Sequence, residues 1–67
     1  YSAVYNVEGD VLYAFNDWRN SLGYPASEET GNIQYFNGGY VQQSTSPCWT
    51  RVYVGGVLQQ TYNGNCN

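Results

Sequence analysis

The stretch LGYPASEETGNIQYFNGGYVQQ, residues 22–43, separates a helix-forming part of the chain from a strand-forming part. Gly23 is the expected left-handed cap at the end of a preceding helix, and Pro25 prevents that helix from resuming. After a polar, acidic loop, residues 33–36 and 39–43 predict a β-hairpin joined by an Asn-Gly turn. The stretch therefore predicts that one helix is followed by antiparallel strands.

An amphipathic helix is predicted over about residues 10–22, upstream of this stretch. Asp10 is well placed to cap its N-terminus. Apolar side chains recur at steps of four, three and four residues, and the stripe consists of Val11, Phe15, Trp18 and Leu22. We expect Phe15, Trp18 and Phe36 to lie in the core.

Residues 49–54 alternate as a strand does, downstream of a predicted linker over residues 44–47. One face of this strand carries Trp49, Arg51 and Tyr53, and the opposite face carries Thr50, Val52 and Val54. The alternation leaves open which face is buried. Residues 57–62 are compatible with a short helix or a last strand.

The length of 67 residues allows one domain, residues 1–67, whose core is small. Cys48 and Cys66 are the only cysteines, and without a histidine they cannot complete a tetrahedral zinc site by themselves. We therefore predict a Cys48–Cys66 disulfide, worth about 3 kcal/mol, and no metal or cofactor. The predicted fold is a small disulfide-bridged α+β module, with the helix on a short antiparallel sheet. A disulfide implies an oxidising compartment, so the chain is predicted to be secreted, extracellular or associated with the cell surface.

The charge of the chain argues against two classes of partner. The net charge is −3, and Arg19 and Arg51 are the only cations. Such a chain does not suit a phosphate backbone, so we predict no nucleic-acid partner. No apolar run approaches the roughly 20 residues that span a bilayer, so we predict no membrane insertion.

The order of motifs in residues 22–40 resembles the LGFP repeat family. The segment LGYPASEE, followed by YFNGGY, is similar to the family's LGxP box and its aromatic-x-Gly-Gly element. The signature positions carried over are Leu22, Gly23, Pro25, Glu28 or Glu29, Phe36, Gly38 and Gly39. The resemblance implies a secreted repeat with a role at the cell wall or in contact with carbohydrate.

A second, partial repeat is indicated by the segments EGDVLYAFN, residues 8–16, and VGGVLQQTY, residues 54–62. We predict an LGFP-like repeat over residues 1–45 and a disulfide-closed half-repeat over residues 46–67. If the half-repeat mirrors the first, residues 57–62 begin a helix. The chain has one box rather than the tandem array that is usual in the family.

No catalytic site is predicted. Without histidine or lysine, the chain has no base to activate a serine or cysteine nucleophile. Paired carboxylates, Glu28 or Glu29 with Asp10 or Asp17, are the remaining option for an enzyme. We interpret them instead as capping or solvated residues, because so small a domain lacks walls for a substrate cleft.

Aromatic residues outside the helix are the candidate binding groups, because the C–H faces of sugars stack on tyrosine and tryptophan while arginine reaches their hydroxyls. The candidate ligand-binding residues are Tyr24, Tyr35, Tyr40, Trp49, Arg51 and Tyr53. The leading hypothesis is a non-enzymatic extracellular module that associates with glycan or cell-wall polymer. One alternative is a structural subunit of an extracellular filament or surface assembly that self-associates through its sheet edges. Another is a small secreted inhibitor or effector that binds a protein partner.

Overall fold

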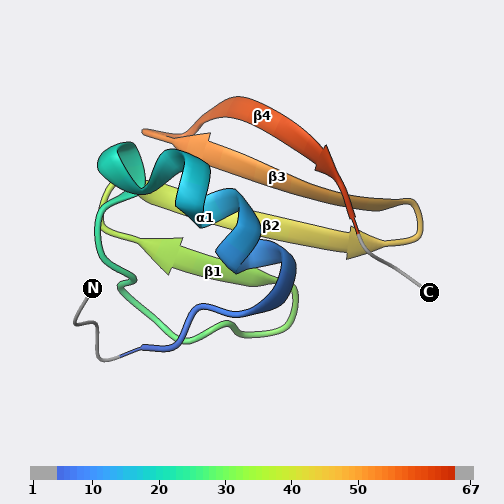
Figure 1. Ribbon diagram of the computed structural model, residues 1–67, viewed down its shortest axis with the longest axis horizontal. Coiled ribbons are helices and arrows are strands. Elements are labelled where there is room, and N and C mark those ends of the chain that lie inside the picture. The colour runs from blue at the N-terminus through green and yellow to red at the C-terminus, as the bar shows by residue number, and fades with distance from the viewer. Residues whose placement is uncertain (1–4, 65–67) are drawn as a thin grey trace.

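The computed structural model describes residues 5–64 as one helix followed by a four-stranded sheet (Figure 1). All neighbouring strands are antiparallel, and their order in the sheet is β1-β2-β3-β4. The elements are α1 (Gly9–Leu22), β1 (Ile33–Phe36), β2 (Gly39–Thr45), β3 (Cys48–Val54) and β4 (Val57–Asn63). The predicted α+β fold, with one helix on an antiparallel sheet, is confirmed. Cys66 lies outside the described residues, so its disulfide with Cys48 stays a prediction.

Helix α1 crosses one face of the sheet and contacts β2 and β3 (Figure 1). Phe15 of the helix stacks on Phe36 of β1, with ring centroids 5.1 Å apart and an interplanar angle of 16°. Both rings are buried, as predicted, and Trp18 packs half-buried at the margin of the core. The buried apolar residues are Val7, Val11, Ala14, Phe15, Leu22, Phe36, Val41 and Val52.

The N-terminus of α1 differs from the prediction. Glu8 is the N-cap, since its backbone is extended and its carbonyl accepts a hydrogen bond from the Leu12 N–H at 3.2 Å. Asp10 lies two residues further on, inside the first turn, so the prediction that it is the capping residue is wrong. In the first turn its carboxylate still interacts favourably with the positive end of the helix dipole.

The C-terminus of α1 is held by the chain that follows it. Gly23 ends the helix with a positive φ of 74°, but its ψ of −158° lies outside the left-handed helical region, so the predicted left-handed cap is wrong in its conformation. Its N–H donates to the Arg19 carbonyl at 2.9 Å. The turn of the first hairpin then docks on the helix end: the Gly38 N–H donates to the Leu22 carbonyl at 2.7 Å. The Asn37 N–H donates to the Tyr24 carbonyl at 3.0 Å. The box and the Gly-Gly element therefore form one connected structural unit.

The remaining strands differ from the prediction in two places. Ser44 and Thr45 extend β2 up to a turn at Ser46 and Pro47, so the linker predicted over residues 44–47 is wrong. Residues 57–62 form part of strand β4, and the helix expected from the partial repeat is wrong. The turn before β4 contains two glycines with φ of 61° and 82°, which suits a tight hairpin and returns the chain along β3.

The two faces of β3 differ in burial. Thr50 is 1% exposed and Val52 is fully buried beneath α1, because these residues belong to the face that the helix covers. Trp49, Arg51 and Tyr53 alternate with them and therefore point away from the helix. No helix within residues 5–64 is long and apolar enough to cross a membrane.

Candidate binding face

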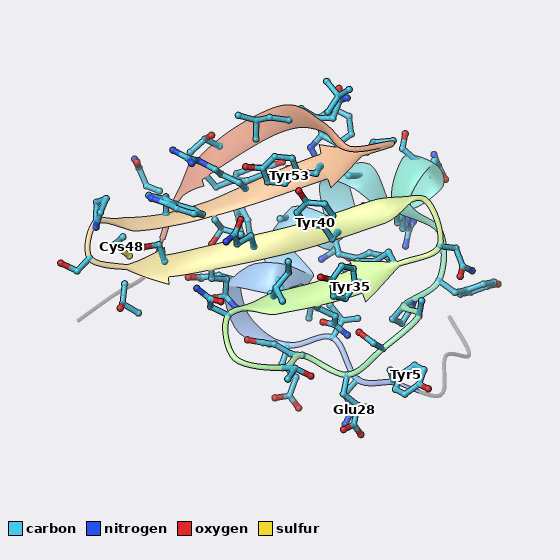
Figure 2. The ribbon with its side chains drawn as sticks, turned by 180° about the vertical axis from the view of Figure 1, so that it is seen from behind. Tyr5, Glu28, Tyr35, Tyr40, Cys48 and Tyr53 are labelled. Atoms are coloured by element: carbon cyan, nitrogen blue, oxygen red, sulfur yellow. The ribbon has the colours of Figure 1, made fainter. Side chains whose placement is uncertain are left out.

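The side of the sheet turned away from α1, here called the open face, brings together most of the predicted binding residues. Antiparallel pairing places residues opposite one another on the same face. Tyr35 of β1 pairs with Tyr40 of β2, and Tyr40 pairs with Tyr53 of β3. Figure 2 shows these three tyrosines side by side across the strands, on the side away from the helix. Trp49 and Arg51 join them on β3, so five of the six predicted residues share this face.

The three tyrosines of the open face, Tyr35, Tyr40 and Tyr53, form what we call the tyrosine row. Tyr40 and Tyr53 stack nearly parallel, with an interplanar angle of 17° and ring centroids 4.5 Å apart. Tyr35 and Tyr40 are tilted by 55° at 5.8 Å. Tyr35 at the β1 end is 51% exposed, and Leu58, opposite Tyr53 on β4, is 46% exposed. The row thus makes a band of apolar surface that crosses the whole sheet.

This stacking limits how the rings can meet a ligand. The faces that Tyr40 and Tyr53 turn toward each other are covered, so these two rings offer mainly their edges and hydroxyl groups. None of the three hydroxyls of the tyrosine row forms a hydrogen bond with another residue of the described part of the chain. They are therefore available to donate to, or accept from, a bound molecule.

Arg51 and Trp49 form the second aromatic feature of the open face. The Arg51 guanidinium carbon lies 4.0 Å from the centroid of the Trp49 ring, which is the geometry of a cation–π contact. This contact orients the guanidinium and covers part of the indole. Arg51 is also paired across the strands with Gln42 of β2 and Thr61 of β4. A polar row, consisting of Gln42, Arg51 and Thr61, therefore runs beside the tyrosine row.

Gln42 and Thr61 were not among the predicted site residues, and only the strand register reveals them. Alternation shows which residues of one strand share a face, but it does not give their neighbours on the next strand. The two-residue turns on either side of β3 are the only sequence signal for that register.

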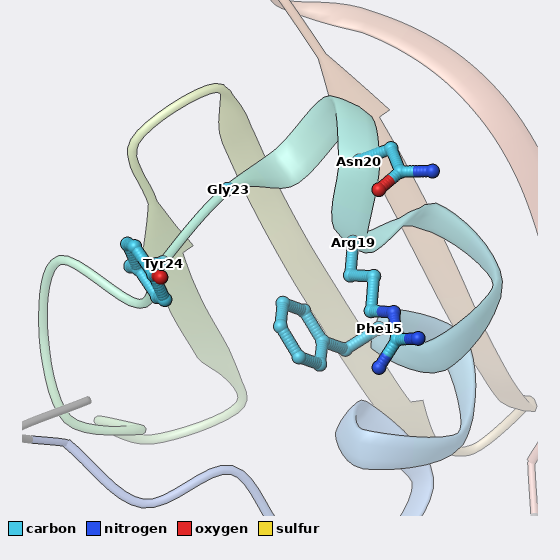
Figure 3. Close-up of a pocket in the computed structure, with 5 residues that line it drawn as sticks. All are labelled: Phe15, Arg19, Asn20, Gly23 and Tyr24. Atoms are coloured by element: carbon cyan, nitrogen blue, oxygen red, sulfur yellow. The ribbon is translucent and has the colours of Figure 1, made fainter. Parts of the chain in front are cut away.

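Tyr24 lies apart from the other predicted residues. It lines a pocket of about 470 Å³ at the C-terminal end of α1, together with Phe15, Arg19, Asn20 and Gly23 (Figure 3). Its backbone adjoins the segment that pairs beside β1, where Pro25 forms a bridge with Phe36. The structure therefore separates Tyr24 from the open face.

Three of the carboxylates, Asp10, Asp17 and Glu29, lie in separate surroundings. Asp17 accepts a hydrogen bond from the Tyr62 hydroxyl at 2.9 Å, and Glu29 accepts one from the Gln43 amide at 2.7 Å. The pocket at Glu29 and the pocket at Asp10 each contain a single carboxylate. Among residues 5–64, no three carboxylate or cysteine side chains gather closely enough to hold a metal ion.

Tyr62, which lies beside the helix, has a shifted pKa. The pKa of Tyr62 is raised above 10.0 by the burial of its phenol and by the hydrogen bond that it donates to Asp17, while the hydrogen bond from Trp18 acts in the opposite direction. This group lies on the helix side of the sheet and takes no part in the open face.

Comparison of the chain with known protein families, with curated proteins and with solved structures finds no match. The LGFP resemblance consequently stays a prediction from the residues that carry it.

Proposed function

We propose that this chain is a non-enzymatic extracellular module that binds carbohydrate of the cell wall through its open face. The observation that carries the proposal is the tyrosine row, which lines up three aromatic side chains from three strands on a face that α1 leaves uncovered. The LGFP-like box supports the same function.

The chemistry of the open face suits a glycan. A sugar has apolar C–H groups on its ring faces and hydroxyls around its edge, so it needs an apolar surface bordered by hydrogen-bonding groups. The tyrosine row supplies the apolar surface, and its three hydroxyls lie at the tips of the rings. The polar row supplies amide, guanidinium and hydroxyl groups along the neighbouring line of the sheet. A chain of sugars crossing the strands can contact both rows together.

The experiment is a sedimentation assay with insoluble wall polysaccharides, combined with electrophoresis through gels that contain soluble polysaccharides. Tyr35→Ala removes the most exposed ring of the row, and Trp49→Ala removes the indole. We expect each to lower the affinity about tenfold, since this corresponds to about 1.4 kcal/mol, which is the size of the contribution that one aromatic contact makes.

Tyr13→Ala is the matched control. Tyr13 is 71% exposed and lies on α1, so its loss removes an aromatic ring from the opposite side of the molecule. Binding should be unchanged in this variant, with the fold checked by circular dichroism. Equal losses in Tyr13→Ala and Tyr35→Ala would reject the open face as the site. A wild-type chain that binds none of the polysaccharides would reject the function.

A second candidate function, a subunit of an extracellular assembly, is favoured by the difference between the two sheet edges. The outer edge of β1 is covered in part by residues 24–26, since the Ala26 N–H donates to the Tyr35 carbonyl at 2.9 Å. Strand β4 has no neighbour on its outer side within residues 5–64, and Val57 on it is 61% exposed. Unprotected edges of this kind pair with other chains.

Sedimentation velocity at rising concentration tests this candidate. Gln59→Lys places a charge on β4, which carries none, and should reduce any association, because edge lysines oppose strand pairing. A wild-type chain that remains monomeric at its solubility limit would eliminate the assembly function.

A further inference from the structure

We propose that the polymer bound by the open face is an acidic polysaccharide whose sugars carry carboxylates, and that Arg51 binds the carboxylate. This inference rests on the proposed carbohydrate-binding function and adds the chemical class of the ligand. It follows from the distribution of charge over the sheet and from the environment of one arginine.

The charges of the chain are strongly segregated. Strands β1 to β4 contain one charged residue, Arg51, although the whole chain has five carboxylates and a net charge of −3. The carboxylates lie at the start of α1, on α1, or in the loop that precedes β1, at Glu8, Asp10, Asp17, Glu28 and Glu29. The open face therefore presents a single positive charge without a neighbouring acid in its strands.

Arg51 is held in place but its charge is not neutralised. No salt bridge or hydrogen bond joins its guanidinium to another residue within the described part of the chain, and its Nε–H is buried without a partner there. The contact with Trp49 at 4.0 Å orients the group without satisfying its N–H donors. A positioned guanidinium with free donors matches a carboxylate, which accepts two parallel hydrogen bonds from it.

The neighbours of Arg51 suit a carboxylate that is attached to a sugar ring. In a uronic acid the carboxylate is bonded directly to the ring, so a carboxylate at Arg51 keeps the ring within reach of adjacent side chains. Gln42 and Thr61 flank Arg51 on the two neighbouring strands and can bind ring hydroxyls. Tyr53 lies two residues along β3 on the same face and offers its ring edge to the apolar part of the sugar.

A polymer that exists in charged and uncharged forms gives the sharpest test. Polygalacturonate and its fully methyl-esterified form share one backbone and differ only in whether the carboxylate is free. We expect the wild-type chain to bind polygalacturonate at least tenfold more tightly than the ester, and to lose this preference as salt is raised. Dextran sulfate, as a third ligand, separates recognition of a carboxylate from attraction to any polyanion.

The two arginines provide matched variants. Arg51→Gln and Arg19→Gln change the net charge equally, but Arg19 lies on α1 beside Tyr24 and away from the open face. Arg51→Gln should lower the affinity for polygalacturonate at least tenfold and the affinity for the ester by a clearly smaller factor, whereas Arg19→Gln should leave both unchanged. Arg51→Lys should recover only part of the loss, since an ammonium cannot form the paired hydrogen bonds.

The outcomes separate the inference from the proposed function. Equal affinity for the acid and the ester, with binding lost in Tyr35→Ala, would overturn the carboxylate inference and leave the carbohydrate function standing. Equal losses in Arg51→Gln and Arg19→Gln, or tighter binding to dextran sulfate than to polygalacturonate, would also overturn the inference. A chain that binds neither neutral nor acidic polymers would overturn both.

Discussion

At the scale of single residues, Gly38 is required for a close backbone contact. An added Cβ at this position would collide with the Ser21 carbonyl oxygen at the end of α1, where the Gly38 N–H bonds to the Leu22 carbonyl. Both partners are backbone, so neither can turn aside. Gly38→Ala should therefore destabilise the fold by about 2 kcal/mol or more, measured by urea unfolding.

Gly31→Ala is the control for this prediction. Gly31 has a φ of 62°, but an added Cβ there meets no atom within 4 Å. The substitution adds only the strain of a left-handed alanine, about 1 kcal/mol. If Gly38→Ala costs no more than Gly31→Ala, the helix end and the hairpin turn are not in tight contact.

Tyr62 joins the last strand to the helix through its hydroxyl group. Its hydroxyl accepts a hydrogen bond from the Trp18 indole at 3.0 Å and donates one to Asp17 at 2.9 Å. Tyr62→Phe removes both and leaves the half-buried indole N–H without this acceptor. We expect a loss of about 1 kcal/mol at neutral pH, measured by urea unfolding.

The pH dependence of this difference follows from the raised pKa of Tyr62. The folded chain holds the phenol proton more tightly than the unfolded chain, whose tyrosine has the ordinary value of 10.0. The contribution to stability is therefore complete below pH 10 and is lost as the pH rises through the higher pKa of the folded state. The other tyrosines are common to both proteins, so the gap between wild type and Tyr62→Phe isolates this group. A gap that is constant up to pH 12 would contradict the assignment.

At the scale of elements, Gln34 connects two loops to β1 from inside the core. The side chain is fully buried, and its amide N–H₂ donates to the Asn6 carbonyl at 2.9 Å and to the Ser27 carbonyl at 3.0 Å. Gln34→Ala should lower the free energy of unfolding by about 2 kcal/mol, because it removes buried contacts and leaves both carbonyls without this donor.

Hydrogen exchange distinguishes this role from simple packing. Gln34→Leu restores the volume without the donors, so it should recover part of the stability while exchange stays faster at the two attached segments, residues 5–8 and 24–30. Normal protection of these segments in Gln34→Leu would show that the hydrogen bonds do not hold them.

The elements that the sequence predicts well are those with local signals. Helix α1 has an apolar stripe and a terminal glycine, and β1 and β2 are joined by an Asn-Gly turn. The sequence does not determine the type of β4, because all its residues but one are exposed and no buried face produces a clear alternation. Pairing with β3 decides its structure, and pairing is not a local property.

For the candidate site, too, the sequence predicts what depends on local signals but not what depends on strand pairing. Residue type alone predicts the six candidate binding residues, and five of them share the open face. Their alignment in rows depends on the register of three hairpins, which alternation alone does not provide. Tyr24 lies apart from the other five because its position depends on how the chain turns after Gly23 and pairs beside β1.

At the scale of the whole molecule, the sheet separates the buried core from the proposed binding face. The face beneath α1 contains the buried core, and the open face contains the tyrosine row, the polar row and Trp49. Substitutions of exposed open-face residues such as Tyr35 should therefore alter binding with little effect on stability. Substitutions such as Gly38→Ala should instead lower stability without removing any open-face side chain.

The predicted Cys48–Cys66 disulfide would join the end of the chain to the start of β3. The Gly64 N–H donates to the Cys48 carbonyl at 3.4 Å, so the chain passes beside Cys48 two residues before Cys66. Two extended residues span roughly 7 Å, which is within reach of a disulfide. Because a domain of this size has a small core, the loop closed by the bond should supply about 3 kcal/mol, a large share of its stability.

Non-reducing mass spectrometry should therefore find the chain lighter by the mass of both thiol hydrogens, and unlabelled by iodoacetamide until it is reduced. A reductant should lower the midpoint of urea unfolding in the wild type, by an amount equivalent to about 3 kcal/mol. The double variant Cys48→Ser with Cys66→Ser should match the reduced wild type and show no response to reductant, since it has no bond to lose. Alkylation of both cysteines in the untreated, folded chain would contradict the bond, and with it the prediction of an oxidising compartment.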